Sequence, residues 1–218
     1  MRRRYTLGVY EAFKNVRTEL QLNRRHRSGL RIARRHHGST DLKLHLGCGP
    51  NHKQGWLNID LMDAAADLSL DLREPLPFAN GSVQHVYSEH AFEHLTYPQE
   101  ANRLLAECLR VLTRGGIFDV GVPDTERAIY DYYVERDPEK LEYARKMWHK
   151  EAWIDLPLHQ LNYHFYQQAE HKYAWDYETL ANVLAKAGFA DVRRRDFDPA
   201  LDNESRRSSL YVRAYKPR

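Results

Sequence analysis

A glycine-rich turn and an aspartate are the first features of the sequence that could bind a ligand. The segment LHLGCGP, residues 44–50, has the pattern of a strand that runs into Gly47-Cys48-Gly49. Glycine has no Cβ and tolerates positive φ, so a ligand can approach the backbone closely at such a turn. Asp60 ends a second predicted strand, and its carboxylate could accept hydrogen bonds from both hydroxyls of a ribose. An ordinary turn at either place is the alternative.

The spacing of these residues argues against a dinucleotide-binding fingerprint. That motif needs a third glycine at position 52, where this chain has His52, and an acid about twenty residues beyond the glycines. Asp60 follows Gly49 by only eleven residues. A nicotinamide-dependent oxidoreductase is therefore disfavoured. Asp71-Leu72 ends a third predicted strand, residues 68–72, and could offer a polar partner and an apolar contact to a purine edge.

Alternating strand and helix patterns position these residues. Further strands are predicted at 56–61, 83–88 and 117–122, a helix over about 99–112, and a final helix ending at Gly188 before strands at 190–197 and 209–215. The 99–112 helix has one apolar stripe and a predicted capping box of Thr96 and Gln99. Strands alternating with helices favour a doubly wound α/β domain, with a mostly parallel sheet covered on both faces. The last two strands fit an antiparallel hairpin.

The positive charge is concentrated at the N-terminus. Residues 1–40 carry eleven Lys or Arg against Glu11 and Glu19, whereas the remaining chain is mildly acidic. Apolar residues at helical spacing predict an amphipathic helix over 8–22: Val9, Phe13, Val16 and Leu20. We expect a basic helical arm at 1–40 and a single domain at 41–218. The arm could bind nucleic acid or an anionic surface, dock on the domain, or form a homodimer.

Composition excludes several classes of protein. No stretch approaches the roughly 18 apolar residues of a membrane span, and the N-terminus has no apolar export signal. Two cysteines cannot make a disulfide framework, and no pair of His or Cys has a recognised metal-ligand spacing, so no metal site is expected. A cytoplasmic location is the simplest expectation.

Three segments resemble class I S-adenosylmethionine-dependent methyltransferases: LKLHLGCGPNHKQGWLNIDL, DLREPLPFANGSVQHVYSEHAFEHL and LLAECLRVLTRGGIFDVGVPD. More narrowly, they resemble a small bacterial group of predicted methyltransferases with an EHxFEHL-type segment. The resemblance covers residues 42–123 and, less closely, 171–216. It leaves 1–40 and 124–170 without a named motif.

The resemblance implies a Rossmann-like sheet of seven strands with an antiparallel last strand, and S-adenosylmethionine as cofactor. The cofactor would lie across Gly47, Cys48 and Gly49, with the ribose at the end of the second strand, the adenine near the third and the methionine part after the fourth. The implied contacts beyond the glycine turn are Asp60, Leu61, Asp71, Leu72, Ser88 and Glu89. The chain departs from the family between its first two strands, where about ten residues are too few for a full helical crossover.

Methyl transfer chiefly requires alignment of the nucleophile, the methyl carbon and the sulfur. If a hydroxyl or amine is the acceptor, a base must take its proton, and His90 after the fourth strand is our candidate. Asp124 and His94 are candidates for the acceptor site, although packing or capping is the favoured role of His94. Residues 124–175, rich in aromatic and histidine side chains and helical over 125–150, could form a lid or simply cover the sheet.

The sequence does not specify the methyl acceptor, and small molecules and glycans both fit. The alternative function is a binding module that keeps the methyltransferase-like fold while its basic arm holds a polyanion, such as nucleic acid or an anionic surface.

Overall fold

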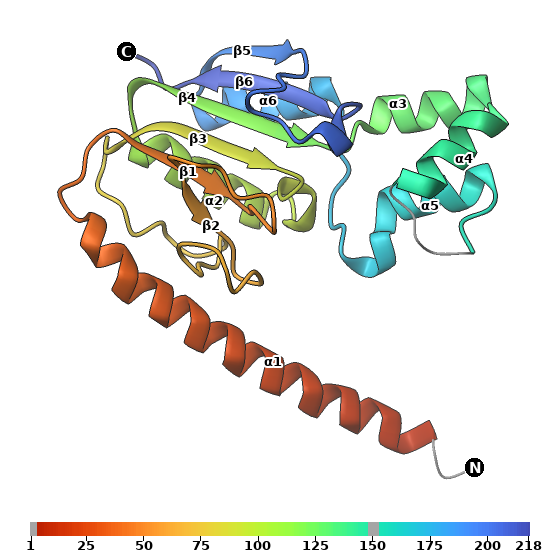
Figure 1. Ribbon diagram of the computed structural model, residues 1–218, viewed down its shortest axis with the longest axis horizontal. Helices are drawn as coiled ribbons and strands as arrows, with labels where there is room; N and C mark the ends of the chain where they lie inside the picture. Colours follow the sequence, from red (N-terminus) through yellow and green to blue (C-terminus); the bar gives the residue numbers. More distant parts are fainter. Residues whose placement is uncertain (1–3, 148–152) are drawn as a thin grey trace.

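One mixed sheet forms the frame of the molecule, which the computed structural model describes over residues 4–147 and 153–218 (Figure 1). The strands lie in the order β2-β1-β3-β4-β6-β5. Their bounds are β1 Leu42–Leu46, β2 Leu57–Ile59, β3 Val83–Glu89, β4 Leu112–Val122, β5 Ala190–Arg195 and β6 Leu210–Tyr215. Strands β1 to β4 run parallel, whereas β6 is antiparallel to both β4 and β5. The predicted antiparallel last strand is confirmed.

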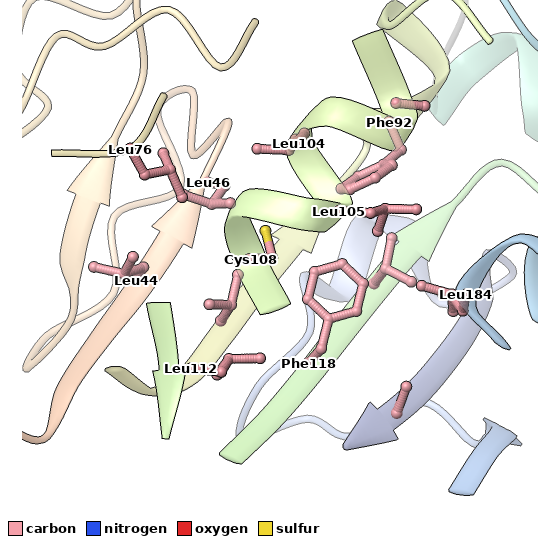
Figure 2. Close-up of a cluster of buried hydrophobic side chains, with 14 of the residues drawn as sticks. Leu44, Leu46, Leu76, Phe92, Leu104, Leu105, Cys108, Leu112, Phe118 and Leu184 are labelled. Atoms are coloured by element: carbon pink, nitrogen blue, oxygen red, sulfur yellow. The ribbon is translucent and has the colours of Figure 1, made fainter. Parts of the chain in front are cut away.

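The α-helices lie in three places around the sheet: α2 and α6 on one face, α1 at the end formed by β2, and α3, α4 and α5 beyond the carboxyl edge (Figure 1). Their bounds are α1 Arg4–Ala33, α2 Gln99–Val111, α3 Thr125–Tyr130, α4 Pro138–Met147, α5 Pro157–Tyr166 and α6 Tyr177–Ala187. Helix α2 buries its predicted stripe against β1 and β4, where Leu105 and Cys108 lie near Phe118 (Figure 2). At its start, Thr96 pairs with Glu100 instead of the predicted Gln99, since both its N–H and hydroxyl donate to the Glu100 carboxylate at 2.8 Å.

The predicted third strand is absent, so the described sheet has six strands and not seven. Residues 68–72 make only one isolated bridge, between Ile59 and Leu68. After that bridge the chain leaves the sheet, because the Asp71 N–H donates to Nδ1 of His26 in helix α1 at 3.1 Å. Leu68 and Leu70 of this segment are buried, but a helix side chain supplies the partner that a strand would have supplied.

The second face of the sheet is polar and lies under loops. Side chains alternate along a strand, so Tyr87 of β3 points away from α2. Its hydroxyl donates to Asp202 at 3.1 Å, and the Lys53 ammonium donates to the carbonyl oxygen of Leu201. These contacts hold the loop after β1 and the loop after β5 over this face. The prediction of helices on both faces therefore holds for one face only in the described part of the chain.

The connection between β1 and β2 is a loop, as the short spacing predicts. The structure shows no helix between Leu46 and Leu57. Buried Asn58 holds this loop in place of a helix: its side-chain oxygen accepts the Lys53 N–H at 2.8 Å and its amide donates to the Lys53 carbonyl at 3.1 Å. The positive end of a helix dipole is consequently missing beside the glycine turn.

Helix α1 is longer than the predicted helix over residues 8–22. Its predicted apolar stripe is exposed, with Phe13 at 72% and Leu20 at 59%. Its C-terminal part packs on the domain, where Ala33 is fully buried and a Cβ on Gly29 would collide with the backbone of the 68–72 segment. The basic arm is not confirmed as a separate unit, and its partners stay predictions.

The segment between β4 and α6 extends beyond the carboxyl edge of the sheet (Figure 1). The single helix predicted over 125–150 is interrupted: α3 is followed by a π-helical turn, Asp131–Glu135, and a left-handed Arg136 precedes α4. Residues 148–150 of that prediction lie outside the described residues. The reason for the break is local, since Arg136 at φ 43° cannot continue a helix.

Candidate active site

The glycine turn at the end of β1 combines close packing with open space. The N–H groups of Gly47 and Cys48 both donate to the carbonyl oxygen of Ile59, at 2.8 and 3.2 Å. Gly47 has φ +65°, and a Cβ there would overlap the Cβ of Ala91. Gly49 has φ +47°, and a Cβ there would meet no atom within 4 Å. Packing thus requires Gly47, while Gly49 borders space that a ligand can fill.

Asp60 holds this turn from the next strand. Its Oδ2 accepts the Gly49 N–H at 2.9 Å, and its Oδ1 accepts the N–H groups of Met62 at 2.7 Å and Asp63 at 2.9 Å. A carboxylate offers about four acceptor positions, so three are engaged and one remains for a ribose hydroxyl. The structure therefore brings Asp60 to the glycine turn, as the sequence predicts, and adds a structural role.

Hydrogen bonds hold the segment expected around the adenine, Asp71 and Leu72, and helix α1 braces the loop before it. Arg73 binds the Asp71 carboxylate through two nitrogens, and its closest distance is 2.7 Å. Burial alone would raise the pKa of Asp71, but the hydrogen bonds from Arg73 outweigh it and lower that pKa. Half-buried Leu72 reaches toward Gly47. Arg25 of α1 donates to the carbonyl oxygen of Leu61 at 3.4 Å, so α1 braces the loop after β2.

Ser88 and Cys48 turn their side chains into the protein. Ser88 is fully buried, and its hydroxyl donates to the carbonyl oxygen of Leu46 at 3.1 Å. Cys48 is 2% exposed, and burial raises the pKa of its thiol to about 12. Any contact of these two residues with a cofactor must therefore use the backbone, and the Cys48 thiol is no nucleophile at neutral pH.

Glu89 at the end of β3 anchors the loop before β6. Its Oε1 accepts the Tyr211 hydroxyl at 2.8 Å and the Asn203 N–H at 3.2 Å. Arg206 donates to the Glu89 carbonyl oxygen at 2.9 Å. Buried Glu89 thus joins the carboxyl end of β3 to residues 203–206, which form one wall of the neighbouring cavity.

A cavity of about 740 Å³ lies at the carboxyl ends of β3 and β4, and none of the predicted cofactor-binding residues is among the residues that line it. Its walls come from α3, the π-helical turn, α5 and residues 204–209. Two of the predicted acceptor-site residues, His90 and Asp124, line it, whereas His94 does not. Asp124 caps α3 by accepting the Arg127 N–H at 3.2 Å, and it accepts a second bond from Arg194 at 3.2 Å.

His90 lies on the cavity wall between two polar groups. Its Nε2 is 2.7 Å from the Ser209 hydroxyl and its Nδ1 is 3.6 Å from Oε1 of Glu93. Burial, and then the charge of Arg206, hold the pKa of His90 well below its ordinary value. The imidazole is therefore neutral at physiological pH, and it is a weaker base than an exposed histidine.

Sequence reasoning missed Glu93 and Ser209 as neighbours of His90, and His171 as a neighbour of His94. Ser209 follows His90 by more than a hundred residues. The rings of His94 and His171 have centroids 5.1 Å apart and are nearly perpendicular. The EHAFEHL segment was a signal for Glu93, but no local pattern links it to the other two residues.

Comparison with known proteins agrees with this geometry. Residues 61–120 match the family model described as a methyltransferase domain. This match begins directly after Asp60 and covers β3, α2 and most of β4. No curated protein matches the chain at a significant level.

Solved structures share the fold. An S-adenosylmethionine-dependent methyltransferase from Archaeoglobus fulgidus is 17% identical, with 91% of this chain and 94% of that chain covered and a TM-score of 0.50. Phosphoethanolamine N-methyltransferase 2 of Haemonchus contortus, solved with phosphomonomethylethanolamine and S-adenosylhomocysteine, is 15% identical at a TM-score of 0.50. There, 88% of this chain covers 53% of the other. A possible exported protein from Bordetella parapertussis is 16% identical, with 89% and 68% covered and a TM-score of 0.50.

The chain thus shares the Rossmann-like fold of solved methyltransferases, and its residues 61–120 match a methyltransferase domain. The residues present fit the cofactor S-adenosylmethionine, because Gly49 borders open space and Asp60 keeps an acceptor position beside it. Among the described residues, no helix is long and apolar enough to cross a membrane.

Proposed function

We propose that this chain transfers the methyl group of S-adenosylmethionine to a small polar acceptor, a small molecule or the end of a glycan, bound in the cavity at β3 and β4. One observation carries the proposal. The cavity, of about 740 Å³, lies at the carboxyl end of β3, and β3 pairs directly with β1, which carries the glycine turn. Ligands of open α/β sheets bind at this edge, so donor and acceptor would lie side by side.

The cofactor would lie across Gly47, Cys48 and Gly49, with its ribose at Asp60 and Leu61. Its adenine would approach Asp71 and Leu72, and its methionine part the backbone at Ser88 and Glu89. The sulfonium supplies an activated methyl group, and the protein's contribution is to hold the acceptor in line with it. The EHAFEHL segment supports the narrower likeness to the small bacterial group with this motif.

The cavity wall favours a polar acceptor. Its polar lining includes four arginines, four acidic residues and serine hydroxyls: Arg127, Arg136, Arg206, Arg207, Asp124, Asp131, Asp137, Glu204, Ser205 and Ser209. Arg127 pairs with Asp131 at 2.8 Å and Arg207 with Glu204 at 2.7 Å, and an acceptor could exchange for such a partner through charge-assisted hydrogen bonds of its hydroxyl, amine or phosphate groups. Asp124 is one of these groups.

His90 would take the proton of an acceptor hydroxyl or amine. Its ring is neutral, and Nε2 faces the cavity-lining Ser209 hydroxyl at 2.7 Å. An acceptor hydroxyl that displaces Ser209 would meet the same nitrogen. His94 would act only through its neighbours, since it is not part of the cavity wall. The binding-module alternative has no support from the fold or the comparisons.

The test is acceptor-dependent release of S-adenosylhomocysteine by the purified chain, with fractionated small-molecule extract and a panel of sugar nucleotides. Once an acceptor is found, His90→Gln should lower the rate by about 10²–10⁴-fold, as expected for loss of a general base, with cofactor affinity nearly unchanged. His159→Gln, on an exposed helix face beside Asp155, is the control. No release with any fraction, although the protein binds S-adenosylmethionine, would contradict the proposal.

A further inference from the structure

Three side chains with metal-ligating atoms converge next to the cavity. Glu93 and His94 belong to the short 3-10 helix Phe92–His94, and His171 follows α5 by several residues. One ligand atom from each lies within 4.8 Å of the others. The backbone brings the segments together, because the N–H groups of Lys172 and Tyr173 both donate to the Glu93 carbonyl oxygen, at 2.7 and 3.2 Å.

Both histidines are oriented as metal ligands are. Nδ1 of His94 is 3.2 Å from the carbonyl oxygen of Glu170, and Nδ1 of His171 is 2.6 Å from the carbonyl oxygen of His164. A carbonyl oxygen only accepts, so each Nδ1 must carry the proton and each Nε2 keeps a free lone pair. A backbone carbonyl on the far nitrogen is the usual support of a metal-bound histidine.

The carboxylate of Glu93 has no hydrogen-bond partner among the described residues. The residue is 2% exposed, and both carboxylate oxygens are buried and unpaired. The nearest basic group is Nδ1 of His90, at 3.6 Å, beyond normal hydrogen-bond length. A buried polar group without a partner is destabilising, so this carboxylate calls for an explanation.

We propose that Glu93, His94 and His171 bind a divalent transition metal ion such as Zn²⁺, through one carboxylate oxygen and two Nε2 atoms. Two histidines and a glutamate are an established donor set for zinc with an open coordination position. Zinc–ligand bonds of about 2.0–2.2 Å need ligand atoms roughly 3.3 Å apart, so the side chains must close in by about 1.5 Å at most. The preference for imidazole distinguishes this site from one for Mg²⁺ or Ca²⁺.

The site borders the cavity through His171 and through its neighbour His90, both of which line it. An ion there would point its open position toward an acceptor and could bind an acceptor oxygen. Binding of an acceptor by the ion rests on the proposed function, whereas binding of the ion itself does not. The binding experiment therefore uses no cofactor and no acceptor, so that the two proposals can fail separately.

A second cluster must be separated from this one. Cys48, His52 and Asp63 also have ligand atoms within 4.8 Å of one another. His52 already pairs with Asp63 at 2.6 Å, and Cys48 is 2% exposed. His52→Ala removes this cluster and leaves the proposed site intact, so it is the matched control.

The experiment measures binding of Zn²⁺ to the full chain after chelator treatment, by calorimetry and by elemental analysis of the dialysed protein. The wild type and His52→Ala should each bind about one equivalent. Glu93→Gln, which is uncharged and of equal size, and His171→Ala should each weaken binding by at least about 10–100-fold. Co²⁺ should give visible absorption bands in the wild type that are lost in His171→Ala, provided that circular dichroism shows this variant to be folded.

Two results would overturn the proposal. One is a folded wild-type protein that binds neither Zn²⁺ nor Co²⁺, in which case Glu93 is a protonated carboxyl group of the core. The other is binding that His52→Ala abolishes and that folded Glu93→Gln retains at full affinity, which would assign the metal to the cluster at the glycine turn.

Discussion

Oδ2 of Asp60 accepts the backbone N–H of Gly49 at 2.9 Å, so the acidic end of β2 holds the ligand-facing turn of β1. The two residues follow adjacent parallel strands, whose carboxyl ends meet at one edge of the sheet. This contact gives Asp60 two roles, which are support of the turn in the free protein and, in our proposal, binding of the cofactor ribose.

Replacing Asp60 should separate these roles. We expect Asp60→Ala to weaken S-adenosylmethionine binding by about 1–3 kcal/mol, because ribose hydroxyls lose a charged acceptor and the turn loses its anchor. The sheet should remain folded, since Asp60 is half-buried at a strand end. Calorimetry with S-adenosylhomocysteine gives the affinity. Asp60→Asn keeps one acceptor oxygen, so its affinity should lie between those of the wild type and Asp60→Ala. Unchanged affinity in both variants would leave Asp60 as a turn residue only.

The close packing of Gly47 against Ala91 predicts a loss of stability when Gly47 is replaced. Gly47→Ala should destabilise the domain by about 1–3 kcal/mol in urea unfolding, because its Cβ would overlap that of Ala91 and its φ is +65°. Gly49→Ala should cost less, since its Cβ would enter open space and only the positive φ is strained.

The double variant Gly47→Ala with Ala91→Gly tests the steric explanation. Removal of the Ala91 Cβ should recover part of the lost stability, while the strain of positive φ stays. If the double variant loses as much unfolding free energy as the two single variants together, or more, the overlap is not the cause.

The polar face of the sheet should make stability depend on acidic pH. Fully buried Asp119 binds Arg213 at 2.8 Å, Arg195 at 3.0 Å and His85 at 2.7 Å. Burial alone would raise the pKa of Asp119, but these hydrogen bonds and charges lower it to about 2. A carboxyl group whose pKa is lower in the folded state stabilises above its unfolded value of 3.8, and that stabilisation is lost as the pH falls toward 2.

We therefore expect Asp119→Asn to lower the free energy of unfolding at pH 7 by about 2 kcal/mol, because half-buried Arg213 loses its anion and Arg195 keeps only the Asp202 carboxylate. The difference from the wild type should shrink between about pH 4 and pH 2. Asp155→Asn, at an exposed carboxylate, should change stability little at any pH. A constant difference across this range would show that Asp119 is not the titrating group.

Helix α1 should tolerate truncation in its first half only. Deleting residues 1–20 removes the exposed apolar stripe, and we expect the melting temperature to change little. Deleting residues 1–38 also removes buried Ala33 and the His26 ring that accepts the Asp71 N–H. The domain boundary predicted at residue 40 would allow this deletion, but these contacts lead us to expect a lower melting temperature and weaker cofactor binding. Equal melting temperatures of the two truncated proteins would restore the predicted boundary.

The sequence by itself determined the features that are encoded within a short window. The β1 strand, the Gly47-Cys48-Gly49 turn, the apolar stripe of α2 and the capped α6 follow from side-chain periodicity, glycine geometry and capping, which act between near neighbours. The short spacing before Asp60 likewise predicted the loop between β1 and β2, because a helical crossover does not fit into ten residues.

Only the tertiary structure decided what depends on contacts between distant segments. Residues 68–72 have a strand pattern, but they make only one bridge to the sheet, and the Asp71 N–H donates to His26 of α1. Glu93 and His171 have no pattern in common, and they meet because the backbone after α5 pairs with the 3-10 helix after β3. Buried hydrogen bonds and charges select their partners in three dimensions, and a local pattern of residue types carries no information on which distant segment supplies them.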